Sequence, residues 1–166
     1  MSREARSGDA DRGSAAGTVL EELRRRGETV ATAESLTAGM VCVALTDVAG
    51  ASRVVRGGVV VYATDLKEQL VGVPRAVLER HGAVHPEIAE RLAEGVRQRC
   101  GADWGIGLTG VAGPSSQDGV PPGAVHLGFA GPGGASVRSE QFSGDRRDVR
   151  CAAVRAALEH FAALLR

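Results

Sequence analysis

The chain has 166 residues, about the size of one domain, with 20 basic and 20 acidic side chains and a formal net charge of zero. This balance gives no global field that would attract nucleic acid or an anionic membrane, so neither is expected as a partner. No stretch approaches the roughly 20 apolar residues that span a bilayer, and the N-terminus lacks the apolar core of a secretory signal. We therefore expect a soluble, cytoplasmic protein.

The first half of the sequence alternates helix and strand patterns. Residues 1–16 mix Arg, Asp, Ser, Gly and Ala without apolar periodicity, so we expect a flexible N-terminal tail followed by one domain over 17–166. The patterns predict helices at about 18–26 and 37–48 and strands at 29–33 and 54–62. A short helix should follow the second strand, end at Gly72 and hold Lys67 in its first turn. This alternation is typical of an α/β fold.

The second half adds helices and a hairpin. Pro74 and Pro86 open two helices, and a strand follows at 103–109. Strands at 124–129 and 136–142 flank Gly131-Pro-Gly-Gly134, which is typical of a hairpin, so the sheet should be mixed. The last helix, from about Asp145, has a predicted core-facing stripe made of Cys151, Val154, Leu158, Phe161 and Leu165.

Cysteine and histidine form no recognisable metal site in the sequence. The cysteines are odd in number and widely spaced, so we expect reduced, buried side chains and no disulfide or zinc site at Cys42, Cys100 and Cys151. His81 and His85 are separated by Gly82 and followed by Pro86, which break any helix that would align them, and no acidic cluster completes a site. We expect these histidines to be helix-end and loop residues and no metal to bind.

One segment, Gly105-Ile-Gly-Leu-Thr-Gly110, matches the G-x-G-x-x-G pattern of dinucleotide-binding proteins. That pattern works where its glycines form a strand-to-helix turn, with an acidic residue about 20 positions later. Here the glycines fall within a predicted strand, a Pro-containing loop follows, and residues 128–134 contain no acid. We therefore do not interpret the segment as a nucleotide site.

Hydroxyl side chains end three of the predicted strands. Ser35, Tyr62 and Thr109 hold these positions, and ligands of open α/β sheets gather at carboxyl strand ends. A serine nucleophile needs a base, and Lys67 could serve if burial lowered the pKa of its amine, with Tyr62 holding or relaying the proton. Amides around 37–39 could donate to a developing oxyanion.

Spacing alone leaves other interpretations open. Ser35 or Thr37 could cap a helix, Tyr62 could be a strand aromatic, and Lys67 could be solvated. Arg146, at the start of the last helix, could bind a phosphate or carboxylate or lie in solvent beside a cap. Neither S-x-x-K nor G-x-S-x-G, two serine-hydrolase signatures, is present.

Five segments occur in the order and spacing of the CinA C-terminal domain family: 33–39, 62–67, 81–84, 109–114 and 142–146. The chain resembles this family from about residue 18 to 165. The resemblance implies a three-layer α/β/α sandwich with a mixed, mostly parallel sheet. It also implies a nicotinamide-nucleotide amidase of pyridine nucleotide salvage, which hydrolyses nicotinamide mononucleotide to nicotinate mononucleotide and ammonia without a metal or organic cofactor.

The resemblance also implies residue roles. Ser35 is the expected nucleophile, Lys67 and Tyr62 its proton-handling partners, Thr109 a substrate-contacting hydroxyl and Arg146 a binder of the nucleotide. The other expected substrate contacts are Thr37, Gly39 and Gly110. We also expect the stand-alone form of the family, without the N-terminal domain of longer members, and a homodimer or higher homo-oligomer.

The chain departs from the family pattern at several positions. Leu36 and Ala38 stand where the family usually has a small or cysteine residue and the first glycine of a pair, and His85 replaces a common serine. The loop at 115–122 lacks a frequent lysine. These departures concern substrate fit more than fold, and two alternatives stay open: a non-catalytic nucleotide- or partner-binding module, and a hydrolase of another amide.

Overall fold

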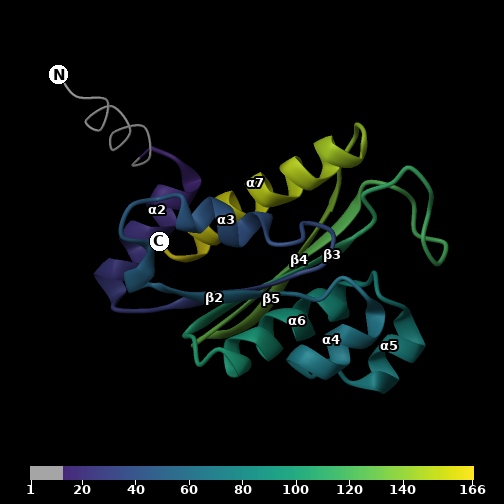
Figure 1. Ribbon diagram of the computed structural model, residues 1–166, viewed down its shortest axis with the longest axis horizontal. Helices are drawn as coiled ribbons and strands as arrows, with labels where there is room; N and C mark the ends of the chain where they lie inside the picture. Colours follow the sequence, from purple (N-terminus) through teal and green to yellow (C-terminus); the bar gives the residue numbers. More distant parts are fainter. Residues whose placement is uncertain (1–12) are drawn as a thin grey trace.

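The computed structural model describes residues 13–166, and its five strands form one open sheet (Figure 1). The strand order is β2-β1-β3-β4-β5. The strands are β1 (Val30–Glu34), β2 (Val55–Val60), β3 (Trp104–Gly110), β4 (Ala124–Gly131) and β5 (Gly134–Gln141). β1 pairs in parallel with β2 and β3, whereas β4 runs antiparallel to β3 and β5. The expected mixed sheet is confirmed, with every strand except β4 pointing the same way.

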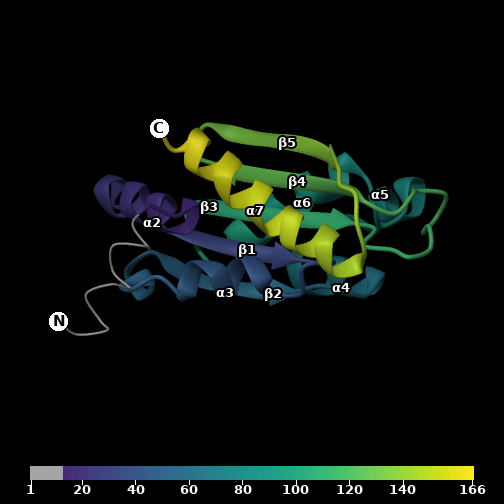
Figure 2. The same cartoon turned by 90° about the horizontal axis from the view of Figure 1, so that it is seen from above.

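Helices cover both faces of the sheet, as expected for a three-layer sandwich (Figures 1 and 2). One face carries α2 (Ala15–Arg26), α3 (Met40–Thr46) and α7 (Arg146–Leu164), and the other carries α4 (Thr64–Val71), α5 (Arg75–His81) and α6 (Pro86–Arg99). A 3₁₀ turn, η1 (Ala51–Arg53), precedes β2. Each face has its own apolar cluster, centred on residues such as Leu20 and Phe161 on the first and Ile88 and Leu92 on the second.

Two helix starts differ from the sequence expectation. α2 begins at Ala15, where the side chain of Ser14 accepts a hydrogen bond from the N–H of Gly17, and residues 1–12 of the expected tail lie outside the described residues. α3 begins at Met40 instead of about residue 37, because Gly39 adopts a left-handed φ of 96° that no continuous helix allows. The segment 36–39 is therefore a turn.

The expectation that the three cysteines are buried was wrong. Cys42 and Cys100 are half-buried, and Cys151 on α7 is exposed. The buried face of α7 includes small residues, Ala153 and Ala157, together with larger side chains such as Phe161. The predicted stripe was drawn through large apolar residues and left out these alanines. The predicted buried face was therefore rotated toward Cys151.

The glycines of the G-x-G-x-x-G segment lie within β3, where they admit helix α6. A Cβ on Gly105 would lie 1.9 Å from the carbonyl oxygen of Ala93, and one on Gly107 would lie 2.4 Å from that of Ala89. Gly128 on β4 meets the same Ala89 oxygen at 2.1 Å. These glycines therefore serve close helix–sheet packing, and α6 occupies the space above them.

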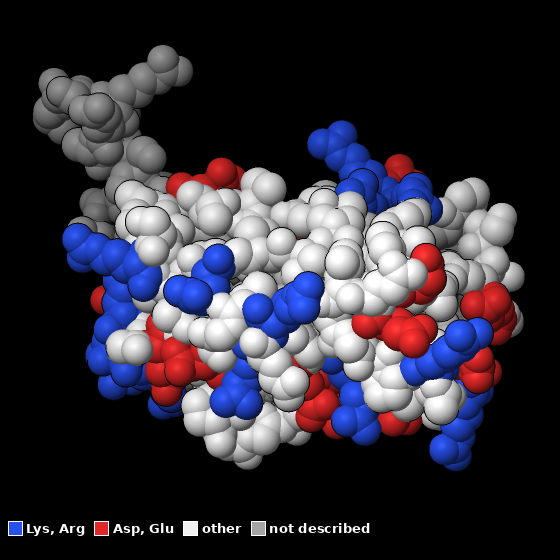
Figure 3. All heavy atoms as spheres, turned by 60° about the horizontal axis from the view of Figure 1, so that its bottom comes forward, with Lys and Arg blue, Asp and Glu red and all other residues white. Residues whose placement is uncertain are grey.

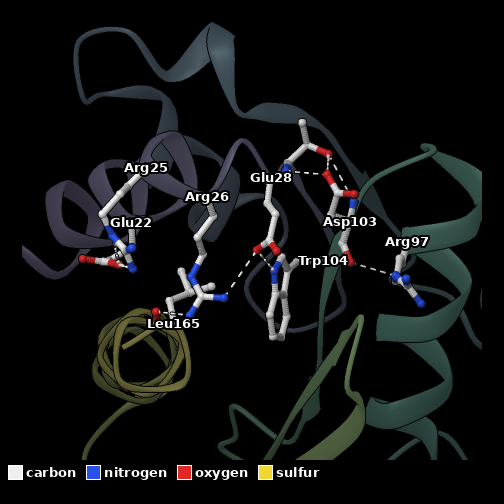
Figure 4. Close-up of polar contacts among 9 residues, drawn as sticks. Glu22, Arg25, Arg26, Glu28, Arg97, Asp103, Trp104 and Leu165 are labelled. Carbon is white, nitrogen blue, oxygen red and sulfur yellow. Dashed lines mark hydrogen bonds and ion pairs between the residues drawn. The ribbon is translucent and has the colours of Figure 1, made fainter.

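Polar contacts close the amino ends of β1 and β3 (Figure 4). One carboxylate oxygen of Asp103 accepts hydrogen bonds from the N–H and the hydroxyl of Thr29, both at 2.8 Å, and these bonds lower the pKa of Asp103. Arg97 donates to the Asp103 carbonyl oxygen at 2.8 Å, and the indole of Trp104 donates to Glu28 at 2.7 Å. These side chains therefore serve structure at the amino edge of the sheet.

Two features of the described residues bear on membrane and nucleic-acid partners. Within residues 13–166, no helix is long and apolar enough to cross a bilayer. On the face seen in Figure 3, basic and acidic side chains are interspersed. This agrees with the zero net charge of the sequence.

Candidate active site

A cavity of about 570 Å³ opens at the carboxyl ends of β1, β2 and β3. It is lined by six of the predicted site residues, namely Ser35, Tyr62, Lys67, Thr109, Gly110 and Arg146. Its far wall presents two hydroxyls and an amide, from Ser115, Ser116 and Gln117. Thr37 and Gly39 do not line it. Among residues 13–166, the charged side chains that line the cavity are those of Lys67 and Arg146, both basic, so the cavity favours an anionic ligand.

Lys67, the only lysine of the chain, is buried beside Ser35. Its side chain is 1% exposed, and its Nζ lies 3.1 Å from Ser35 Oγ, 2.8 Å from the carbonyl oxygen of Val61 and 3.3 Å from that of Tyr62. Burial lowers the pKa of the amine from 10.5 to about 8, although the nearby carboxylate of Asp65 acts to raise it. About a tenth of the amine is therefore neutral at pH 7, far more than for a solvated lysine.

The partners of Lys67 orient its lone pair. A neutral amine has two N–H groups and one lone pair, and the carbonyls of Val61 and Tyr62 can accept both hydrogens. The lone pair is then left for the third neighbour, the hydroxyl of Ser35. This arrangement is what a general base for a serine nucleophile requires.

Glu34, which sequence reasoning missed, fixes the chain at Ser35. Its carboxylate is 1% exposed and accepts hydrogen bonds from the N–H groups of Gly39, Val41 and Cys42 at 3.1, 3.0 and 2.9 Å. A buried carboxylate thus caps the start of α3 from the last residue of β1. The sequence held one signal, an acidic residue ending an otherwise buried strand directly before the candidate nucleophile.

This cap corrects one expectation about the oxyanion. The N–H of Gly39 donates to Glu34, and the N–H of Ala38 donates to the carbonyl oxygen of Ser35 at 3.1 Å. Both amides are engaged, so Gly39 cannot donate to a substrate in this conformation. Thr37 is fully buried, and its hydroxyl has no hydrogen-bond partner within the described residues.

Tyr62 and Arg146 lie together at the mouth of the cavity. The Tyr62 side chain is 57% exposed, and its hydroxyl oxygen accepts a hydrogen bond from Arg146 Nη2 at 2.8 Å. The other terminal nitrogen of Arg146 donates to the carbonyl oxygen of Gly113 at 2.8 Å. Lys67 contacts the carbonyl and not the hydroxyl of Tyr62, so the hydroxyl is free to donate its proton to a ligand.

Thr109 and Gly110 form the floor of the cavity where β3 ends. The buried hydroxyl of Thr109 donates to the carbonyl oxygen of Ala83 at 2.6 Å, which ties β3 to the segment before α6. A Cβ on Gly110 would lie 2.7 Å from the carbonyl oxygen of Ala124, so this position accepts only glycine at the present spacing of β3 and β4. The oxygen of Thr109 can still accept a hydrogen bond from a ligand.

His81, His85 and Glu87 come together beside the cavity, contrary to the expectation that no acid completes the histidine pair. Their potential ligand atoms lie within 4.8 Å of one another. The two imidazole rings are stacked at 3.9 Å, Nδ1 of His85 accepts a hydrogen bond from the N–H of Glu87, and the Glu87 carboxylate lies 3.2 Å from Nε2 of His81. Nδ1 of His85 already serves the start of α6, and an ion in the plane of one of the stacked rings would lie out of the plane of the other.

Comparison with known proteins gives the chain its family. The sequence profile of the CinA C-terminal domain matches residues 13–165. The chain belongs to the CinA C-terminal domain family. The predicted membership is therefore confirmed over essentially all of the described residues.

The chain is similar in sequence to two longer CinA-like proteins. The chain is 52% identical over 133 residues to a CinA-like protein of Anaeromyxobacter dehalogenans, covering 80% of this chain and 33% of that protein. It is 47% identical over 143 residues to one of Frankia casuarinae, covering 86% and 33%. The chain thus matches about a third of each of these longer CinA relatives.

The solved structures share the CinA fold over nearly their whole length. The competence/damage inducible protein CihA of Agrobacterium tumefaciens superposes with a TM-score of 0.87 at 35% identity, covering 92% of this chain and 94% of that one. A CinA superfamily protein of Klebsiella pneumoniae superposes with a TM-score of 0.88 at 30% identity, covering 91% and 95%. These matches agree with the three-layer architecture described above.

Proposed function

We propose that this CinA-family chain is an amidohydrolase that converts nicotinamide mononucleotide to nicotinate mononucleotide and ammonia in pyridine nucleotide salvage. The observation that carries the proposal is the buried amine of Lys67, whose pKa is lowered to about 8 and whose nitrogen lies 3.1 Å from Ser35 Oγ. A buried amine of this kind is an unusual and costly arrangement outside a reactive site.

The proposed reaction proceeds through an acyl ester on Ser35. Ser35 Oγ bonds to the carboxamide carbon, its proton passes to the neutral amine of Lys67, and the carbonyl π electrons move onto oxygen. The intermediate then collapses, the C–N bond breaks, and the departing nitrogen takes the proton from Lys67 to leave as ammonia. Water attacks the ester by the same proton route and releases the carboxylate, which restores the Ser35 hydroxyl.

The charge of the cavity supports a nucleotide monophosphate as substrate. Arg146 supplies the cation at the mouth, where it can bind a phosphate, while Lys67 lies deep beside the nucleophile. Ser115, Ser116 and Gln117 offer neutral hydrogen-bonding groups that suit a ribose between the two ends. Binding of the phosphate at Arg146 would hold the carboxamide near Ser35.

Ammonia release from nicotinamide mononucleotide tests the proposal. We expect the purified protein to release ammonia and the Ser35→Ala variant to release none, with Ser136→Ala on the exposed part of β5 as the matched control. Equal release by Ser35→Ala and wild type would contradict the nucleophile. Binding of the nucleotide by folded wild type without turnover would instead favour a non-catalytic binding module, and turnover of a different carboxamide would favour another amidase.

We also propose a cytoplasmic homodimer with no nucleic-acid partner. The dimer follows from the family resemblance. The absence of a nucleic-acid partner follows from the zero net charge of the sequence and the interspersed charges on the face seen in Figure 3. Light scattering coupled to size-exclusion chromatography at micromolar concentration would measure the mass, and a mass of one chain would contradict the dimer.

A further inference from the structure

The turn that follows Ser35 contains two backbone donors without partners. The N–H groups of Ser35, Ala38 and Gly39 each donate to an oxygen of the protein. Between them, the N–H groups of Leu36 and Thr37 donate to no protein atom among residues 13–166. Unpaired amides directly after a nucleophile are the donors that an oxyanion requires, and Leu36 lines the cavity.

Arg150 holds this turn from outside the cavity. Its Nε donates to the carbonyl oxygen of Leu36 at 2.8 Å, across 114 positions of the chain. Arg150 does not line the cavity; it lines a neighbouring surface groove with Met40, Arg147 and Cys151, and Arg146 lines both. Its hydrogen bond to the Leu36 carbonyl is therefore the direct link between Arg150 and the turn beside the nucleophile.

The geometry of the peptide bond makes that contact directional. The peptide between Leu36 and Thr37 is planar and trans, so its carbonyl and its N–H point in opposite directions. A guanidinium fixed on the Leu36 oxygen therefore also fixes the direction of the Thr37 N–H. A cationic donor on the carbonyl further polarises the peptide and makes its N–H a stronger donor.

We propose that Arg150 is a positioning residue, which holds the Leu36–Thr37 peptide and with it the turn, so that the free N–H of Leu36 at the cavity receives the oxyanion formed when Ser35 attacks. The inference rests on the proposed function, because it assigns a role within the same acyl transfer. Without Arg150 the peptide can rotate, and the donors are no longer preorganised for the developing charge.

The test separates this role from the identity of the substrate. A fluorophosphonate reacts with an activated serine by forming an Oγ–P bond and releasing fluoride, and its phosphoryl oxygen needs the same donors as an oxyanion. We would measure its rate of reaction with wild type, Arg150→Met and Arg147→Met, with Ser35→Ala to identify the labelled site. Arg147 is exposed at the start of α7, and its guanidinium makes no hydrogen bond or ion pair within the described residues.

We expect Arg150→Met to react at least about tenfold more slowly than wild type and Arg147→Met to react at the wild-type rate. With nicotinamide mononucleotide, Arg150→Met should lower kcat by about a hundredfold and leave KM within about twofold, because the contact acts on the oxyanion and not on the phosphate. The pH midpoint of labelling should stay where it is in wild type, since Lys67 is unchanged.

A second variant keeps the proposal testable if Arg150→Met is poorly folded. Arg150→Lys retains a cationic donor, and we expect it to recover part of the labelling rate. Labelling of folded Arg150→Met at the wild-type rate would overturn the inference, and so would labelling of folded Arg150→Lys that is slowed by the full factor of about ten or more expected of Arg150→Met. If wild type is labelled at Ser35 but releases no ammonia, nicotinamide mononucleotide is not the substrate and the Arg150 comparison remains valid. If wild type is neither labelled nor releases ammonia, both the proposed function and the role of Arg150 are overturned.

Discussion

Tyr62 and Arg146 are 84 positions apart in the chain, and the phenol oxygen of the first accepts a 2.8 Å hydrogen bond from the guanidinium of the second. Arg146 also donates to the carbonyl oxygen of Gly113, so two of its five N–H groups hold the mouth of the cavity together. Three remain for a ligand. Arg146 thus joins the end of β2, the loop after β3 and the start of α7.

The remaining donors of Arg146 predict a phosphate-dependent effect. Arg146→Met should raise KM for nicotinamide mononucleotide by roughly ten- to a hundredfold, because charge-assisted hydrogen bonds contribute about 1.5–3 kcal/mol. The same variant should change KM for nicotinamide riboside, which has no phosphate, by much less. Steady-state kinetics with both substrates checks this, and an equal effect on the two would assign Arg146 to the architecture of the cavity alone.

The buried amine of Lys67 predicts a pH dependence. Its pKa is lowered to about 8, and only the neutral amine can accept a proton, so kcat/KM should fall about tenfold per pH unit below pH 8 and level off above it. Because Lys67 is the only lysine, NMR of protein with ¹⁵N-labelled lysine side chains would report this one amine directly. A titration midpoint near the ordinary 10.5 would contradict the assignment of Lys67 as the base.

The convergence of Ser35, Tyr62 and Thr109 was predictable because carboxyl strand ends of parallel neighbours lie at one edge of a sheet. The contacts that prepare the site were not predictable in this way. Glu34 is recognisable as a cap only once α3 is seen to start at Met40, and Arg150 meets its peptide across 114 residues. Short-range sequence patterns predict where strands end. Which backbone amides remain without a partner depends on tertiary contacts between residues far apart in the chain.

The cap on α3 predicts a large stability effect from a small change. Glu34→Gln keeps the shape of the side chain but places an NH₂ group where the carboxylate now accepts from backbone amides. We expect the free energy of unfolding to fall by about 1–3 kcal/mol. Urea unfolding measures this, with Glu21→Gln on the exposed side of α2 as a control that should change little. Equal free energies of unfolding for the two variants would contradict the role of Glu34 as a stabilising cap of α3.

Close packing of α4 on α6 predicts an effect on activity from a position far from the cavity. A Cβ on Gly95 would lie 1.9 Å from the carbonyl oxygen of Val71 in α4, so Gly95→Ala must displace one helix. We expect a loss of about 1–3 kcal/mol in stability and a fall in kcat of up to about a hundredfold, since α4 carries Lys67. Gly133→Ala, where no atom lies within 4 Å of the added carbon, is the matched control. Full activity in a folded Gly95→Ala protein would contradict the coupling.

Helix α6 contacts both the glycines of the sheet and its neighbour on the same face, helix α4, which presents Lys67. On its sheet side the close approach is permitted by glycines of β3 and β4, and on the side toward α4 by Gly95. A single methyl group at Gly95 would displace α4 and with it the proposed base, although it brings no polar atom to the reaction. The placement of Lys67 thus depends on positions that have no side chain at all.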